Sequence, residues 1–142
     1  MIYCCSIENY IKTFFSSKLE DLILSYETAA SYLGLANEDG FPLVFHHRIS
    51  DNINSSYMNG IYVKEIDLTN TKIINEIICT DEERTICELI KYDRDIQCIL
   101  ESLNKYISKN ESIGLLRERA REYGIGQELE VFINGALEYY ND

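Results

Sequence analysis

The sequence predicts a mixed α/β (α+β) fold, with a small central sheet of three or four strands flanked by helices and a helical C-terminal half. Three observations predict it. The chain has 142 residues, an ordinary length for one domain. Hydrophobic residues make up 46% of it, enough for a packed core. The hydrophobic pattern changes from helical to strand-like and back, and the chain contains no linker-like tract. We therefore expect a single domain over residues 1–142.

The first part of the chain has a helical pattern. Its apolar residues recur at spacings of three, four and five as far as Ile23, which predicts one or two helices and, over residues 1–21, an extra N-terminal helix. Ser25 then precedes an alanine-rich run over residues 26–33, and Gly34 follows it. We expect a short helix here, capped by Ser25 and ended by Gly34.

The middle of the chain has the composition of strands. Short runs rich in β-branched and aromatic residues occupy residues 42–47, 60–67 and 72–79, and a polar segment over residues 50–56 separates the first two. These runs predict the three or four strands of the sheet, with a loop over residues 50–56.

The rest of the chain predicts helices. The first begins where Thr80 can act as N-cap and Glu83, three residues later, can complete a capping box. Three more apolar stripes cover residues 96–107, 112–123 and 127–140. The residues expected in the core are Ile86, Leu89, Ile90, Leu100, Leu103, Phe132 and Leu137.

The charge balance bears on the choice of partner. The chain carries 24 acidic and 13 basic residues, a formal net charge of −11. Both halves are acidic, so no basic half exists to neutralise phosphates, and we expect no independent binding to DNA. The acidity is typical of a well-solvated surface, although an acidic docking face for a basic partner fits it as well.

Cysteine usage and hydropathy indicate a cytoplasmic protein without a membrane span. The five cysteines form no C-x-x-C pair, which favours reduced thiols over a disulfide framework or a zinc site. Two of them, Cys4 and Cys5, fall in the expected N-terminal helix. The N-terminus lacks the basic and apolar regions of a signal peptide, and no run of 18 apolar residues occurs.

The search for chemistry predicts no catalytic, cofactor-binding or metal-binding residue. His46 and His47 are adjacent, and neighbours on a strand point to opposite faces, so they cannot chelate one ion together. The glycines form no phosphate-binding loop, and no G-x-S-x-G occurs. A paired-carboxylate site stays open, but we expect the protein not to be an enzyme.

Three arginines lie close together in one predicted helix. Arg117, Arg119 and Arg121 are spaced by two, so they spread around the helix and alternate with Glu118 and Glu122. This pattern predicts a solvated, salt-bridged helix surface rather than a nucleic-acid site.

Three strings in the chain carry a family resemblance. They are SYETAASYLGL over residues 25–35, DEERTICELI over 81–90 and LLRERAREYGI over 115–125. Their order and separation resemble the C-terminal domain of AbiEi-type antitoxins, which belong to bacterial abortive-infection, type IV toxin–antitoxin systems. The match covers about residues 22–140. The residues that carry it, for which we expect structural roles, are Tyr32, Gly34, Leu35, Glu83, Arg84 and Thr85.

The resemblance implies an antitoxin domain whose partner is a nucleotidyltransferase-type toxin, acting in phage defence without a cofactor. Family members carry a winged-helix DNA-binding domain ahead of this domain, and only about 20 residues precede the match here. We therefore expect the chain to bind a protein partner and not operator DNA. We expect the chain itself to be a monomer or a homodimer. Two alternatives stay open: a phage or mobile-element inhibitor of a host defence complex, and a transcriptional accessory protein.

Three of the residues that carry the resemblance also have structural explanations that do not depend on it. Glu83 is expected to help cap its helix, Arg84 to form a buried or half-buried ion pair that ties this helix to the sheet, and Gly34 to end the earlier helix.

Overall fold

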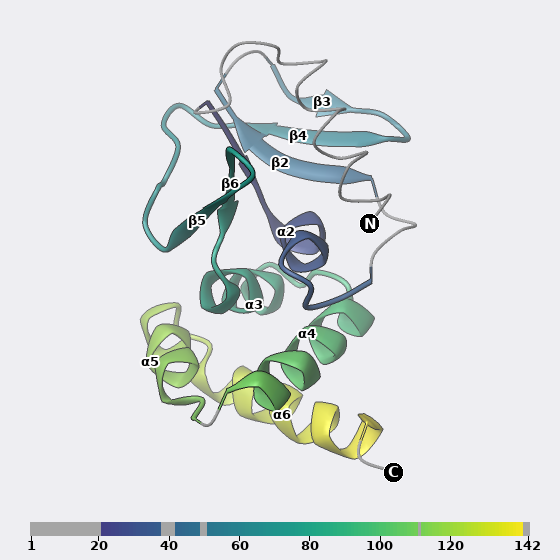
Figure 1. Cartoon of the computed structure of the whole chain (residues 1–142), viewed down its shortest axis with the longest axis vertical. Coiled ribbons are helices and arrows are strands. Elements are labelled where there is room, and N and C mark those ends of the chain that lie inside the picture. Colours follow the sequence, from purple (N-terminus) through teal and green to yellow (C-terminus); the bar gives the residue numbers. More distant parts are fainter. Residues whose placement is uncertain (1–20, 38–41, 49–50, 111, 141–142) are drawn as a thin grey trace.

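The computed structural model describes residues 21–37, 42–48, 51–110 and 112–140. A sheet with the strand order β3-β4-β2-β1-β6-β5 lies above a layer of helices (Figure 1). The strands are β1 (Leu22–Leu24), β2 (Leu43–His47), β3 (Ile53–Asn54), β4 (Met58–Tyr62), β5 (Thr71–Ile74) and β6 (Ile77–Thr80). The helices are α2 (Tyr26–Tyr32), α3 (Glu82–Lys91), α4 (Ile96–Lys109), α5 (Gly114–Glu122) and α6 (Gly126–Tyr140).

The predicted fold class is confirmed, including the helical C-terminal half, but the sheet has six strands instead of three or four. The largest correction concerns β1, because the helical pattern was extended through Ile23. Residues Leu22–Leu24 are all buried, and β1 pairs with β2 on one side and with β6 on the other. A central strand covered on both faces has a continuous apolar run, which periodicity alone does not distinguish from a helix.

The other two corrections concern turns. The run over residues 72–79 is a hairpin, because Asn75 and Glu76 adopt positive φ angles of 51° and 70° and reverse the chain between β5 and β6. The predicted loop over residues 50–56 contains β3, which pairs with β4. Neither turn contains a glycine or proline, the residues that most strongly indicate a turn.

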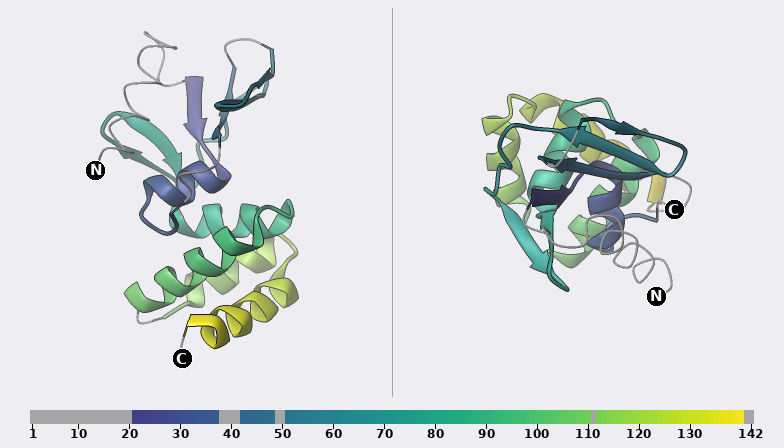
Figure 2. Two further views of the ribbon diagram at one scale, coloured as in Figure 1. Left: turned by 90° about the vertical axis from the view of Figure 1, so that its right-hand side faces the viewer. Right: turned by 90° about the horizontal axis from the view of Figure 1, so that it is seen from above.

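Two apolar cores flank the sheet. One lies among α3, α4, α5 and α6 and reaches the sheet at Val44. The other contains side chains of β1, β2, β4 and β6 and is covered by Ala29 and Tyr32 of α2. Helix α2 lies between the sheet and the other helices (Figure 2), and Ala30 on its other side belongs to the first core. This position explains why the helix is rich in small residues, since it must approach packed layers on two sides.

The expected core residues are partly confirmed. Ile86, Leu89, Ile90 and Leu103 are buried, whereas Leu100, Phe132 and Leu137 are partly buried and pack against the edge of the helical core.

The helix ends follow local capping chemistry. Helix α2 begins after Ser25, as expected, but the serine side chain makes no capping hydrogen bond. At the other end, Gly34 adopts a φ of +77°, a conformation that glycine reaches without strain. The N-cap of α3 is Asp81 instead of Thr80, because the Asp81 carboxylate accepts from the Arg84 backbone N–H at 2.8 Å. The helix predicted over residues 1–21, with Cys4 and Cys5, lies outside the described residues except for its last position.

Candidate functional site

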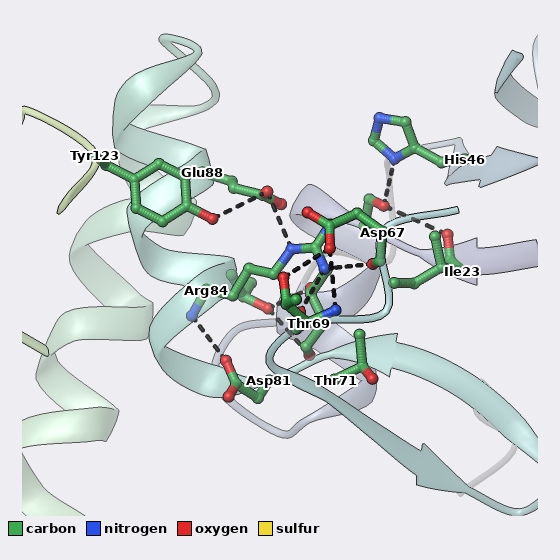
Figure 3. Close-up of polar contacts among 12 residues, drawn as sticks. Ile23, His46, Asp67, Thr69, Thr71, Asp81, Arg84, Glu88 and Tyr123 are labelled. Carbon is green, nitrogen blue, oxygen red and sulfur yellow. Dashed lines mark hydrogen bonds and ion pairs between the residues drawn. The ribbon is translucent and has the colours of Figure 1, made fainter. Parts of the chain in front are cut away.

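The polar centre of the molecule lies around Arg84, on the side of α3 that faces the sheet (Figure 3). Its guanidinium Nη1 donates to the backbone oxygens of Asp67 and Thr69, both at 2.7 Å. Its Nε donates to Glu88 Oε2 at 3.1 Å, one turn along the helix. The Arg84 side chain is only 7% exposed. Arg84 is therefore a buried ion-pair former, as predicted, but the ion pair is internal to α3, and α3 is held to the segment before β5 by hydrogen bonds to backbone carbonyls.

Glu88 is the acidic member of this centre. Its Oε2 accepts from Arg84 and from the Tyr123 hydroxyl, the latter at 3.3 Å, while its Oε1 is buried without a hydrogen-bond partner among the described residues. Burial raises the pKa of the Glu88 carboxyl above its ordinary value, and the Arg84 charge opposes that rise. Burial also raises the pKa of the Tyr123 hydroxyl. Tyr123 therefore acts as a neutral donor at physiological pH.

The first turn of α3 contacts several neighbouring elements. The Glu83 carboxylate accepts from the Tyr106 hydroxyl of α4 at 2.6 Å, so Glu83 does not complete the predicted capping box. Thr85 and Thr80 share a hydrogen bond of 2.6 Å between their hydroxyls, and Asp81 forms an ion pair with Arg119 of α5 at 3.5 Å. Each polar side chain in this turn thus fixes the position of a different element.

The three remaining residues of the family resemblance lie at the end of α2. The Tyr32 hydroxyl donates to the Ile74 carbonyl at 3.0 Å, which fixes α2 against β5. Gly34 ends the helix, and Leu35 is buried in the helical core. All six residues are therefore found at contacts between elements or at a chain reversal.

Two histidines on β2 lie on opposite faces of the sheet, as expected. His46 Nδ1 lies 2.6 Å from Ser25 Oγ, and its ring contacts the edge of Tyr26. His47 packs instead against Phe45 and Tyr62. Ser25 is fully buried, so the Ser25–His46 pair has the geometry of a structural hydrogen bond and not that of an accessible nucleophile.

The pKa values of both histidines are lowered. For His46 the largest cause is burial, and the nearby Arg84 and Arg94 charges add to it. For His47 burial is again the largest cause, and a hydrogen bond with the Gly60 backbone opposes it. Both rings are therefore neutral near pH 7.

One major polar contact was not predicted from the sequence, the ion pair between Arg94 and Glu27. Arg94, in the loop between α3 and α4, donates to both carboxylate oxygens of Glu27 at 2.6 to 3.1 Å, and its guanidinium lies 4.5 Å above the Tyr26 ring. Tyr26 has a φ of 49°, a rare conformation for a bulky residue. A signal was available, because a Glu inside an alanine-rich buried helix requires a charged partner.

Two of the three arginines of α5, Arg117 and Arg119, form ion pairs, but with partners on other elements, and Arg119 is only 17% exposed instead of solvated as predicted. Arg117 pairs with Glu130 of α6 at 2.6 Å, and Arg119 pairs with Asp81. Both pairs connect helices instead of stabilising α5 internally.

The thiols of the described residues are buried and form no reactive centre. Cys79, Cys87 and Cys98 are buried, and burial raises the pKa of Cys79 and Cys87 to about 12. In the described ranges, no group of three His, Cys, Asp or Glu side chains is placed to hold a metal ion. None of the helices in that part of the chain has the length and hydropathy to cross a membrane.

Comparison with known proteins gave no match, either among protein-family models or among curated proteins.

Proposed function

We propose that this chain is a non-enzymatic protein-binding domain of the AbiEi antitoxin type, which neutralises a nucleotidyltransferase-type toxin. One observation supports the proposal most directly. The three strings of the resemblance fold as α2, α3 and α5, and residues within them connect α2 to β5, α3 to the segment before β5, and the start of α3 to α5. A motif that builds a scaffold in this way leaves the outer surface available for a partner.

Surface properties give further support. Several large apolar side chains are exposed, and among the described residues they include Ile73 at 72%, Val131 at 70% and Leu68 at 56%. Exposed apolar side chains of this size can supply the apolar contact area of a protein interface. The polar side chains around Arg84, by contrast, are engaged within the domain.

Co-expression with a nucleotidyltransferase-type toxin tests the proposal, and a gene for such a toxin next to this one is the first candidate. Toxin alone should stop growth, and toxin with the wild-type chain should restore it and co-elute in size-exclusion chromatography. Arg117→Ala serves as the matched control, since its exposed ion pair leaves the core intact and growth should still be restored. Continued arrest with both proteins soluble and abundant would refute the proposal.

A second candidate function is inhibition of a host defence complex through an acidic, nucleic-acid-like surface. The observation that favours it is a set of exposed carboxylates on α5 and α6 in a chain of net charge −11: Glu118, Glu122, Glu128 and Glu138. Such binding would weaken steeply between low and physiological salt. Pull-down from host lysate at both salt concentrations separates this function from the first, because capture that does not depend on salt excludes it.

A further inference from the structure

Strand β5 forms one edge of the sheet. β5 is the last strand in the sheet order and pairs only with β6 among the described residues. Ile73 in this strand is 72% exposed and Leu68, just before it, is 56% exposed. Natural proteins usually protect such an edge with a proline, a bulge or an outward lysine. Here Lys72 is directed to α3, where its Nζ lies 2.8 Å from Glu82 Oε2.

The register of the hairpin identifies which backbone groups point outward. Ile74 and Ile77 flank a two-residue turn, so they form a hydrogen-bonded pair, and such pairs alternate along an antiparallel ladder. The bond from the Asp81 N–H to the Asn70 carbonyl, at 2.9 Å, fits this alternation. The N–H and C=O groups of Thr71 and Ile73 are therefore directed away from β6, toward solvent.

A groove lies on the Lys72 side of the same strand. It has a volume of about 370 Å³, and it is lined by two glutamates, two lysines and three uncharged residues: Glu82, Glu83, Lys72, Lys109, Leu35, Tyr106 and Asn110. The bonds from Lys72 to Glu82 and from Tyr106 to Glu83 each use Oε2. An ionised carboxylate has about four acceptor sites, so both side chains can accept from a further cation.

We propose that an extended segment of a partner protein adds to β5 as a seventh strand. The segment pairs with the outward backbone groups of Thr71 and Ile73. Side chains alternate across a strand, so those on one face pack against Ile73 while those on the other enter the groove beside Glu82 and Glu83. The segment therefore alternates apolar residues with lysine or arginine, in keeping with the net charge of −11. That the toxin supplies the segment rests on the function proposed above.

Binding of a synthetic peptide tests the strand addition without the toxin. An eight-residue peptide of alternating valine and lysine is titrated into the labelled full chain, and amide exchange is followed by NMR. Exchange at Thr71 and Ile73 should slow at least about tenfold, with little change at Lys72, whose amide already faces β6. A valine–glutamate peptide and a scrambled valine–lysine peptide are the matched controls. Absence of binding, or equal protection with the scrambled peptide, would overturn the inference.

Two substitutions separate the backbone contribution from the side-chain contribution. Ile73→Pro removes an outward donor while leaving the bonds with β6, so the peptide should bind about tenfold more weakly. Ile73→Thr keeps the donor and removes apolar area, so it should weaken binding less. Unchanged affinity in Ile73→Pro contradicts strand addition, and if this variant does not fold, amide protection in the wild-type chain decides.

The toxin experiment is then interpreted separately. Wild-type chain that binds the peptide but fails to restore growth argues against the antitoxin function and leaves strand addition intact. A toxin complex that forms equally well with Ile73→Pro would show that the toxin binds elsewhere.

Discussion

Helix α3 and strand β5 are linked by the Lys72–Glu82 ion pair, but they differ in which side chains they bury and which they expose. In α3 the charged Arg84 and Glu88 are almost fully buried and bonded to each other, whereas in β5 the apolar Ile73 is largely exposed. A buried charge is tolerated only where partners replace its hydration, and an exposed isoleucine gains nothing from the fold. The comparison separates residues that stabilise the domain from residues that are available to a partner.

The largest expected loss of stability comes from removing Arg84 from the polar centre. Arg84→Ala leaves the Glu88 carboxylate buried without its cation and the Asp67 and Thr69 carbonyls without a donor, which should cost about 3–5 kcal/mol of unfolding free energy. Urea unfolding followed by circular dichroism measures the loss.

The exposed pair of α5 and α6 provides the control for Arg84. Arg117→Ala should change stability little, since solvent already screens the Arg117–Glu130 pair. Replacing both Arg84 and Glu88 by Met and Leu should recover much of the loss, because no unpaired charge is then buried. Similar losses in Arg84→Ala and Arg117→Ala would show that burial does not distinguish the two arginines.

The second prediction compares apolar residues of the two regions. Leu103 is fully buried in α4, so Leu103→Ala should cost about 2–5 kcal/mol. Ile73→Ala should change stability by less than about 0.5 kcal/mol, because its side chain is 72% exposed. The midpoints of urea unfolding test both, and a loss under about 1 kcal/mol for Leu103→Ala would contradict its packing.

The helices and the core were predictable because their signals are local. The apolar stripe over residues 96–107 and the glycine at position 34 each predict an element from a few neighbouring residues. Strand β1 was missed because its three buried residues acquire their identity from pairing with β2 and β6, which are distant in the sequence. The turn at Asn75 and Glu76 was missed because it uses neither glycine nor proline.

The polar contacts also divide into those between near neighbours in the sequence, which were predictable, and those between distant residues, which were not. The buried ion pair of Arg84 follows from spacing, since Glu88 lies four residues later on the same helix. Other contacts join distant parts of the chain. Tyr106 and Glu83 are separated by 23 positions in the sequence, and Glu27 and Arg94 by 67. Local spacing does not identify the partner in such a tertiary contact, and for this reason the predicted capping role of Glu83 was wrong.

A third prediction extends the comparison to the core on the sheet. Gly60 of β4 lies so close to the Phe45 ring that a Cβ would be 2.8 Å from two ring atoms, and Phe45 is fully buried. Gly60→Ala should therefore cost about 1–3 kcal/mol through overpacking. Gly114→Ala is the control, since the nearest atom would be Ser112 Oγ at 3.4 Å, and its effect should stay within about 1 kcal/mol. Thermal unfolding of the two variants distinguishes a local clash from a general intolerance of glycine replacement.

The smallest expected effect is a pH dependence of the unfolding free energy, which arises from His46 of β2. Burial, Arg84 and Arg94 lower the pKa of His46, so between this folded-state pKa and about 6.5 the unfolded chain binds more protons than the folded one. The stability due to neutral His46 is therefore present above pH 6.5 and is lost as the pH falls below it.

The His46→Asn variant isolates this contribution, because asparagine can bond to Ser25 but does not titrate. Unfolding free energies at pH 7.5, 6.5 and 5.5, about one unit to either side of the ordinary histidine pKa, should decline less in the variant than in the wild-type chain. The raised pKa of Glu88 has the opposite sign, since the folded state then binds the extra proton and gains stability on acidification. That contribution is present in both proteins, as is the contribution of His47, so the difference between the two curves reports His46. Parallel curves would show that His46 has the same pKa in the folded and unfolded chains and that the arginine charges do not reach it.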